Sequence, residues 1–152
     1  MPKVESIGLK GELFIEVRDK KTGKLKKRIH ERNAVLVLGA AKALDVFTVG
    51  GTYSKDQYVY LYDSSKTLIK QLTGTWGTKT DTGTSQYNEL EAKDESNDSY
   101  TVAYLGLTEE SSDPGYENNH FAYKPSEAIT KGASDTLTIR WRITVSYSSA
   151  PA

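Results

Sequence analysis

The stretch that decides the fold is Asp135–Ser146, DTLTIRWRITVS, in a sequence of 152 residues. Apolar and polar residues alternate strictly along it, a period of two that is typical of a strand with one buried and one exposed face. We predict that one face belongs to the core and that the other, with Arg140 and Arg142, meets solvent or an acidic partner. The predicted core residues are Leu137, Ile139, Trp141, Ile143 and Val145.

The rest of the sequence also has the composition of a β-rich domain. It contains 10 Tyr and 2 Trp, together with many Thr and Ser, and these residues favour strands. Clusters of Gly and of Asp-Ser separate the candidate strands and indicate turns. Because the length suits one domain, we predict a single mainly β domain over residues 1–152, an antiparallel β-sandwich or a barrel-like fold with one short helix.

The one candidate helix lies in Asn33–Gly51. Asn33 is a suitable N-cap, and a stripe of apolar residues follows at helical spacing, formed by Leu36, Ala40, Leu44 and Phe47. Val35–Leu38 could instead continue a strand. In either case we predict a helix over Gly39–Phe47.

A basic hairpin is predicted near the N-terminus, at about residues 9–30. Gly11–Arg18 and Lys24–His30 read as strands around the turn Asp19–Lys24, where Gly23 supplies a positive φ. No aromatic residue stands among the lysines to stack a base, so we do not expect nucleic acid as a partner. Lysines on a hairpin also protect an exposed edge from aggregation. The lysines that we predict as interface candidates are Lys20, Lys21, Lys24 and Lys26.

Three alternating tyrosines, Tyr58, Tyr60 and Tyr62, mark another strand, which is followed by a second one within Thr67–Gly77. Their simplest role is cross-strand packing. The tyrosines could instead form part of an interface, or a stacking surface for carbohydrate together with Trp76.

Charge is divided between two parts of the chain, although the net charge is zero. Residues 1–33 contain ten Lys or Arg and five Asp or Glu, whereas residues 81–119 contain ten Asp or Glu and one Lys. We predict that the acidic middle is rich in loops. The two regions are either separate solvated faces or complementary surfaces, which could belong to different copies of the chain.

The search for catalytic and metal-binding motifs gives no candidate. The sequence has no Cys, and its two histidines, His30 and His120, lack the spacing of metal ligands. Asp94–Ser99 alternates oxygen ligands as calcium loops do, but Gly is missing at the sixth position and Glu at the twelfth. We expect no enzymatic activity, cofactor or metal. The N-terminus has no apolar signal region, and no stretch has the roughly 18 apolar residues of a membrane span.

The order of three segments resembles a pattern in structural proteins of tailed bacteriophages and some archaeal viruses. These segments are IHERNAVLVLGAAKAL (Ile29–Leu44), YTVAYLGL (Tyr100–Leu107) and ITKGASDTLTIRWRITVS (Ile129–Ser146). The shared features are a His-x-x-Asn entry to a Gly-containing helix, a strand ending in Gly-Leu, and a closing strand with alternating apolar residues around Trp. One departure is Tyr104, where the family commonly has Glu.

The resemblance implies a non-enzymatic virion component, located at the capsid surface or in a tail appendage. It also implies a component present in many copies. From the divided charge and the two-faced closing strand we predict assembly with copies of itself as a homo-oligomer, most simply a trimer, or with other virion proteins. Two other classes of function stay open. The first is a carbohydrate-binding β-sandwich, and the second is a small hydrolase, for which the sequence offers no nucleophile and base pair.

Overall fold

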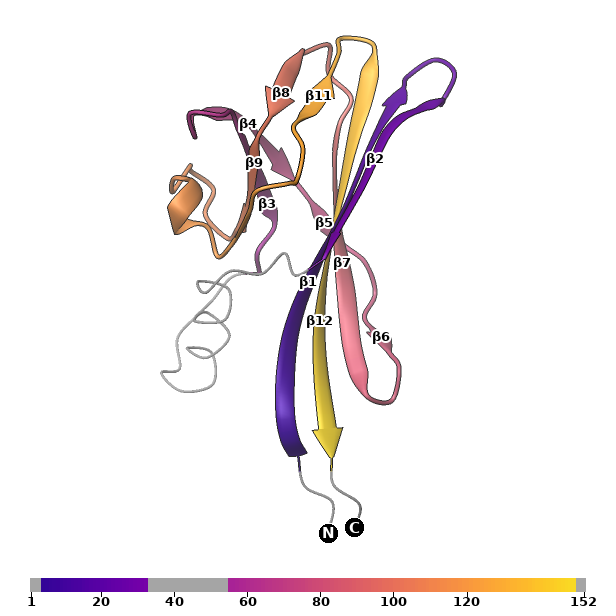
Figure 1. Ribbon diagram of the computed structural model, residues 1–152, viewed down its shortest axis with the longest axis vertical. Coiled ribbons are helices and arrows are strands. Elements are labelled where there is room, and N and C mark those ends of the chain that lie inside the picture. The colour runs from indigo at the N-terminus through magenta and orange to yellow at the C-terminus, as the bar shows by residue number, and fades with distance from the viewer. Residues whose placement is uncertain (1–3, 33–54, 150–152) are drawn as a thin grey trace.

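The structure, a computed structural model, describes residues 4–32 and 55–149. These residues form a mainly β fold, as predicted, in which all paired strands are antiparallel (Figure 1). The predicted helix at Gly39–Phe47 lies outside the described residues.

The large sheet has the strand order β2-β1-β12-β7-β5, and β6 pairs with β7 beyond that path. The C-terminal strand β12 is therefore central, between the N-terminal strand β1 and the strand β7. The strands are β1 (Val4–Asp19), β2 (Leu25–Arg32), β5 (Thr75–Trp76), β6 (Thr80–Asp81), β7 (Ser85–Asp94) and β12 (Asp135–Ser149).

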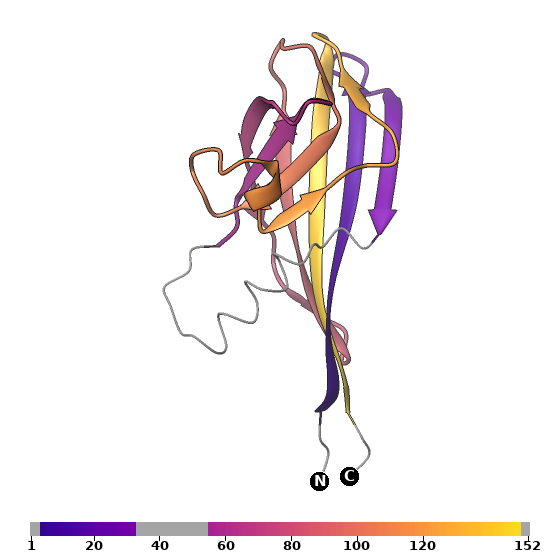
Figure 2. The same cartoon turned by 60° about the vertical axis from the view of Figure 1, so that its left-hand side comes forward.

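A smaller sheet of order β10-β9-β3-β4 covers the upper part of one face of the large sheet (Figures 1 and 2). A third pair, β11 with β8, lies beside it, and a short 3-10 helix precedes β10. The elements are β3 (Tyr58–Tyr62), β4 (Leu68–Thr73), β8 (Tyr100–Val102), β9 (Tyr104–Thr108), η1 (Tyr116–Asn118), β10 (Phe121–Tyr123) and β11 (Ile129–Lys131).

The predicted hairpin is present as β1 and β2, with longer strands than the alternation indicated. Asp19 shapes the turn, because its carboxylate accepts hydrogen bonds from the backbone N–H groups of Lys21 and Thr22 at 2.9 and 2.8 Å. Gly23 follows with φ of 71°, a conformation that Gly adopts without a steric penalty.

The core lies between the large and small sheets. On the large sheet it contains Leu137, Ile139 and Trp141 of β12, all fully buried as predicted. On the small sheet the alternate residues of β3 and β9 face them, namely Val59, Leu61, Leu105 and Leu107. The tryptophan of the closing strand is thus first a core residue.

Below the small sheet, the described part of the large sheet continues with no second sheet against it, and we call this part the stem. It consists of Val4–Gly11 of β1, Ile143–Ser149 of β12 and Ser85–Asn88 of β7, paired through Gly11↔Ile143 and Ile143↔Asn88 (Figure 1). Among the described residues, no second sheet lies against its inner face, the face that carries Trp141 higher up (Figure 2).

The predicted core extends too far along β12, into the stem. Ile143 is only partly buried at the edge of the core, and Val145 is 44% exposed. Both residues lie on the predicted face of the strand, but Val145 lies beyond the reach of the small sheet. The alternation of the sequence therefore identified the correct face and overestimated how far that face is covered.

The acidic middle is also different from the prediction. Residues 85–94 are not loop but strand β7, which pairs with β12 along its whole length. The remaining acidic segment, residues 109–119, folds over the outer face of the small sheet, where Tyr60 Oη donates to the carbonyl of Glu110 at 2.7 Å and Tyr62 Oη donates to Asp113 at 2.6 Å.

Candidate functional site

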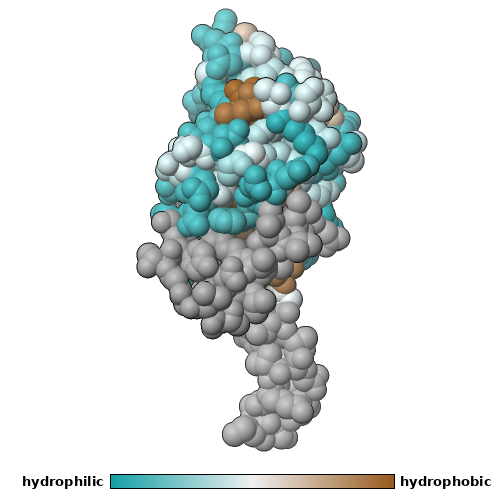
Figure 3. All heavy atoms as spheres, turned by 90° about the vertical axis from the view of Figure 1, so that its left-hand side faces the viewer, coloured by the Kyte–Doolittle hydropathy of each residue, from teal (hydrophilic) through white to brown (hydrophobic). Residues whose placement is uncertain are grey.

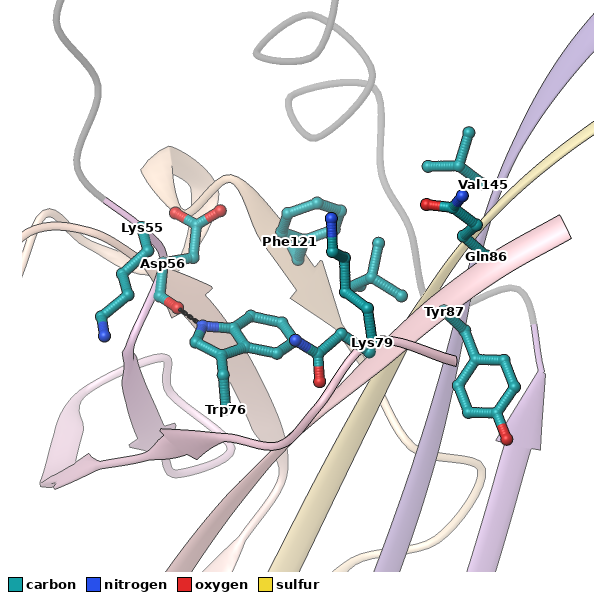
Figure 4. Close-up of a pocket in the computed structure, with 10 residues that line it drawn as sticks. Lys55, Asp56, Trp76, Lys79, Gln86, Tyr87, Phe121 and Val145 are labelled. Carbon is teal, nitrogen blue, oxygen red and sulfur yellow. Dashed lines mark hydrogen bonds between the residues drawn. The ribbon is translucent and has the colours of Figure 1, made fainter. Parts of the chain in front are cut away.

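An open pocket of about 610 Å³ lies where the small sheet ends and the stem begins (Figure 4). Its size is within the range of small-molecule sites in proteins. The apolar walls come from three strands, with Trp76 of β5, Phe121 of β10, and Ile143 and Val145 of β12. The polar lining is formed by Lys55, Asp56, Lys79, Gln86 and Asn88.

The indole of Trp76 is held in place by the chain that enters β3. Its Nε1–H donates to the carbonyl oxygen of Asp56 at 2.6 Å, a bond drawn in Figure 4. The Asp56 carboxylate is in turn 2.8 Å from Nδ1 of His120, the residue before Phe121. Because both strands beside the pocket are linked through Asp56, the aromatic walls are positioned before any ligand binds.

The pairing of His120 with Asp56 is the feature that sequence reasoning missed. The two residues are 64 positions apart, and neither belongs to a motif. In the described part of the chain, His120 has no second hydrogen-bond partner, and no Ser or Thr hydroxyl is bonded to it. The pair therefore lacks the nucleophile that a triad requires, and the geometry is that of a structural link.

The pocket has a positive rim. Lys55 and Lys79 are exposed, and neither has an ion-pair partner among residues 4–32 and 55–149. In Figure 4 their ammonium groups lie on opposite sides of the Trp76 indole. The one carboxylate of the lining, Asp56, lies against His120, so the site offers apolar walls together with two available cations.

Tyr87 also borders the pocket, but its side chain points to the other side of the large sheet (Figure 4). There it stacks on Arg142, whose guanidinium carbon is 4.5 Å from its ring centroid and 5.3 Å from that of Phe14. Phe14 also stacks on His30, with 4.3 Å between centroids. The outer face of the sheet thus carries a row of alternating aromatic and cationic groups.

The predicted interface arginines are engaged within the chain. Arg140 Nε is 3.1 Å from Glu91 Oε2, and Arg142 Nη2 is 3.0 Å from Glu89 Oε2. Each pair crosses from β12 to β7, its direct neighbour. Both arginines are about one-third exposed, so each remains part of the molecular surface, but neither is an unpaired cation.

The lysines of the hairpin divide into two groups. Lys26 forms an ion pair of 2.6 Å with the buried carboxylate of Asp135, and Lys20 donates to the side chain of Asn97 at 2.8 Å. The side chains of Lys21 and Lys24 are exposed and have no partner among the described residues. Of the four lysines predicted as interface candidates, these two are the ones whose side chains have no hydrogen-bond or ion-pair partner in the described part of the chain, so they can meet a partner molecule.

The three tyrosines do not form a stacking surface. Tyr60 and Tyr62 are 1% and 0% exposed, because the acidic segment over residues 109–119 covers them. Burial raises the pKa of Tyr62 well above its usual range, and its hydrogen bond to Asp113 adds to that effect. Tyr58 is partly exposed. The carbohydrate surface and the interface predicted from Tyr60 and Tyr62 are therefore wrong.

The segment that resembles a calcium loop encloses a lysine ammonium group instead of a metal. Lys70 Nζ lies 3.2 Å from Asp94 Oδ1, 2.8 Å from Ser96 Oγ and 2.7 Å from Asp98 Oδ2. Burial alone would raise the pKa of Asp94, but hydrogen bonds from Tyr100, Ser96 and Lys70 outweigh it and hold that pKa well below its usual range.

A second lysine supports the same loop from below. Lys131 is fully buried, and its Nζ donates to the backbone carbonyls of Ser96 and Asp98, both at 2.7 Å, and of Gly132 at 3.2 Å. Burial lowers the pKa of this lysine, while the nearby Asp94 carboxylate opposes that shift. The loop therefore holds two lysine ammonium groups. Its alternating Asp and Ser side chains contact Lys70, and its backbone carbonyls contact Lys131.

Comparison of the chain with protein-family models, with curated proteins and with solved structures found no match. In the described ranges, no group of three or more His, Cys, Asp or Glu residues is arranged to hold a metal ion. None of the helices described is long and apolar enough to span a bilayer. The surface in Figure 3, above the grey atoms, is mainly hydrophilic with a small apolar patch.

Proposed function

We propose that this protein is a non-enzymatic structural component of a virion, at the capsid surface or in a tail appendage, and that it acts by assembling with copies of itself. The proposal rests on two independent observations. The first is the resemblance of three sequence segments to structural proteins of tailed bacteriophages and archaeal viruses. The second, which carries the proposal, is the single-layered stem.

A sheet that exposes an apolar face to water is energetically unfavourable. Stable domains bury the apolar face of a sheet against a second layer. In the described residues the inner face of the stem carries Leu9, Ile143 and Val145 with no sheet against them, and Val145 is 44% exposed. Stems of neighbouring copies would supply the missing layer.

The exposed charges of the hairpin turn and of residues 109–119 lie outside the stem (Figure 1), and they suit a role in register more than in affinity. Exposed ion pairs contribute only about 0–1 kcal/mol each, and they are screened within about 10 Å at 0.1 M salt. Lys21 and Lys24 of the hairpin and the acidic segment over residues 109–119 carry exposed charges of opposite sign. We expect that raising the salt concentration slows association and has a smaller effect on the final complex.

The oligomeric state tests the proposal directly. Light scattering coupled to size-exclusion chromatography should give a multiple of the 16.8 kDa chain mass, with three copies as the expected state. Leu9→Gln, on the inner face of the stem, should raise the dissociation constant about fivefold or more, since about 1 kcal/mol of partial Leu burial is lost per chain. Lys10→Gln, one residue along on the opposite face, is the matched control.

Two results would contradict the assembly proposal. One is a monomer at tens of micromolar that also fails to rebind particles stripped of this subunit. The other is equal weakening by Leu9→Gln and Lys10→Gln, which would place the interface away from the inner face of the stem. In both variants circular dichroism should first show an unchanged fold, so that weaker association is not a consequence of unfolding.

A further inference from the structure

We infer that the pocket beside Trp76 is a binding site for an amphipathic carboxylate, a molecule with an apolar body and one anionic group. This function goes beyond assembly. Its apolar wall shares Ile143 and Val145 with the inner face of the stem, whereas its charged residues, Lys55 and Lys79, lie outside the stem. The apolar body would lie among Trp76, Phe121 and Ile143, and the carboxylate would lie at Lys79, with Lys55 adding to the positive potential.

The shape and lining of the pocket favour this class of ligand. Its volume of about 610 Å³ exceeds what a single side chain fills and suits a ligand of drug or fatty-acid size. The apolar side chains come from strands of both sheets, so an inserted body would be enclosed from two directions. Burial of such a body contributes about 25 cal/mol per Å² of apolar surface removed from water.

The charges at the rim of the pocket favour an anionic ligand over a neutral one. Two lysines stand at the rim without an ion-pair partner in the described residues, while the Asp56 carboxylate lies 2.8 Å from His120. A cation next to apolar walls attracts an anion more strongly than it does in open water, because the local dielectric constant is lower. A cationic ligand would be repelled by Lys79, and a neutral ligand could accept a hydrogen bond from it but would lack the attraction between opposite charges.

The aromatic walls are preorganised for binding. Trp76 donates to the Asp56 carbonyl at 2.6 Å, and the same residue holds His120, which immediately precedes Phe121. The side-chain amide of Gln86 has no hydrogen-bond partner within residues 4–32 and 55–149. It lies on the stem side of the pocket, where it can donate to a carboxylate oxygen as well (Figure 4). The two aromatic side chains would therefore lose little conformational freedom when a ligand binds.

The two tryptophans allow a direct test. Trp141 is fully buried in the core, whereas Trp76 lines the pocket, so a Trp141→Phe variant reports on the pocket alone. We expect that titration of this variant with dodecanoate shifts or quenches the Trp76 fluorescence in a saturable manner. Dodecanol, which has the same chain and no charge, should bind at least tenfold more weakly.

Charge variants identify the residues involved. In the Trp141→Phe background, Lys79→Glu should weaken dodecanoate binding at least tenfold and Lys55→Glu severalfold. Lys21→Glu makes the same charge change on the distant hairpin and should leave the affinity unchanged. Since none of the three lysines lies in the stem, the assembly state should be the same in all of them, which separates this proposal from the assembly proposal.

Three results would overturn the inference. The first is no change in Trp76 fluorescence up to the solubility limit of dodecanoate. The second is equal binding of dodecanol and dodecanoate, and the third is an equal effect of Lys79→Glu and Lys21→Glu. If Trp141→Phe does not fold, the parent protein with both tryptophans can be titrated by isothermal calorimetry against the same two ligands, with the same three outcomes.

Discussion

Trp141 and Val145 offer a direct test of where the core of this protein ends. They lie on the same face of β12, four residues apart, yet Trp141 has no exposed surface and Val145 is 44% exposed. Trp141→Ala removes a fully buried aromatic side chain, which costs about 3–5 kcal/mol of unfolding free energy. Val145→Ala removes two methyl groups that are only about half buried, so we expect about 1 kcal/mol or less.

These free energies translate into separate melting temperatures. For a domain of this length, 1 kcal/mol shifts Tm by about 2–4 °C. Trp141→Ala should therefore lower Tm by about 6–20 °C, and Val145→Ala by no more than about 4 °C. Thermal and urea unfolding followed by circular dichroism measure both variants. The protomer concentration must be the same throughout, because association adds to the apparent stability.

Two outcomes would refute the reasoning. A Trp141→Ala protein that melts within a degree or two of the parent would mean that the faces of β12 are reversed. A Val145→Ala protein destabilised as strongly as Trp141→Ala would mean that the inner face of the stem is as deeply buried as the core. The predicted order of the two variants does not depend on the absolute stability of the parent.

Three further predictions concern the packing and charge of the small sheet and its loops. Gly106→Ala should cost about 1–3 kcal/mol in urea unfolding, because its Cβ would overlap the buried side chain of Asn119, whereas Gly77→Ala, with room around its Cβ, should have little effect. The folded state lowers the pKa of Asp94, so the ionised carboxylate stabilises the fold at neutral pH, and this stabilisation is lost as the pH falls below about 5. The Asp94→Asn variant should therefore be less stable than the parent at pH 7 and should lose less unfolding free energy than the parent between about pH 7 and pH 3. Lys131→Met should cost about 1–3 kcal/mol in the same assay, since three backbone carbonyls lose the donor that the buried Lys131 provides, and an unchanged midpoint would contradict that role.

The alternation in Asp135–Ser146 predicted the strand and its inward face, because a period of two follows from strand geometry alone. It could not predict where burial ends, since that depends on how far the small sheet reaches along β12. Trp141 and Val145 have the same pattern in the sequence and different surroundings in the fold. A local pattern gives the direction of a side chain and says nothing about its distant neighbours.

The tyrosines of β3 failed as a predicted surface for the same reason. Tyr60 and Tyr62 could be assigned to one face, but the segment that covers that face lies about fifty residues later in the chain. The candidate pocket was missed because its lining comes from short, separate pieces of sequence. Among its lining residues, the sequence indicated Trp76 as a candidate for ligand contact and assigned Ile143 and Val145 to the core. The pairing of Asp56 with His120 carries no local signal.

The central position of β12 determines when the large sheet can form. This strand is the last one along the chain, yet it separates β1 from β7 and pairs with both over most of its length. During synthesis at about 5–20 residues per second, β1 must wait roughly 6–25 seconds for its partner, with its edge exposed to other chains. We expect slow folding dominated by contacts between the two ends of the chain, and aggregation of fragments that end before residue 135.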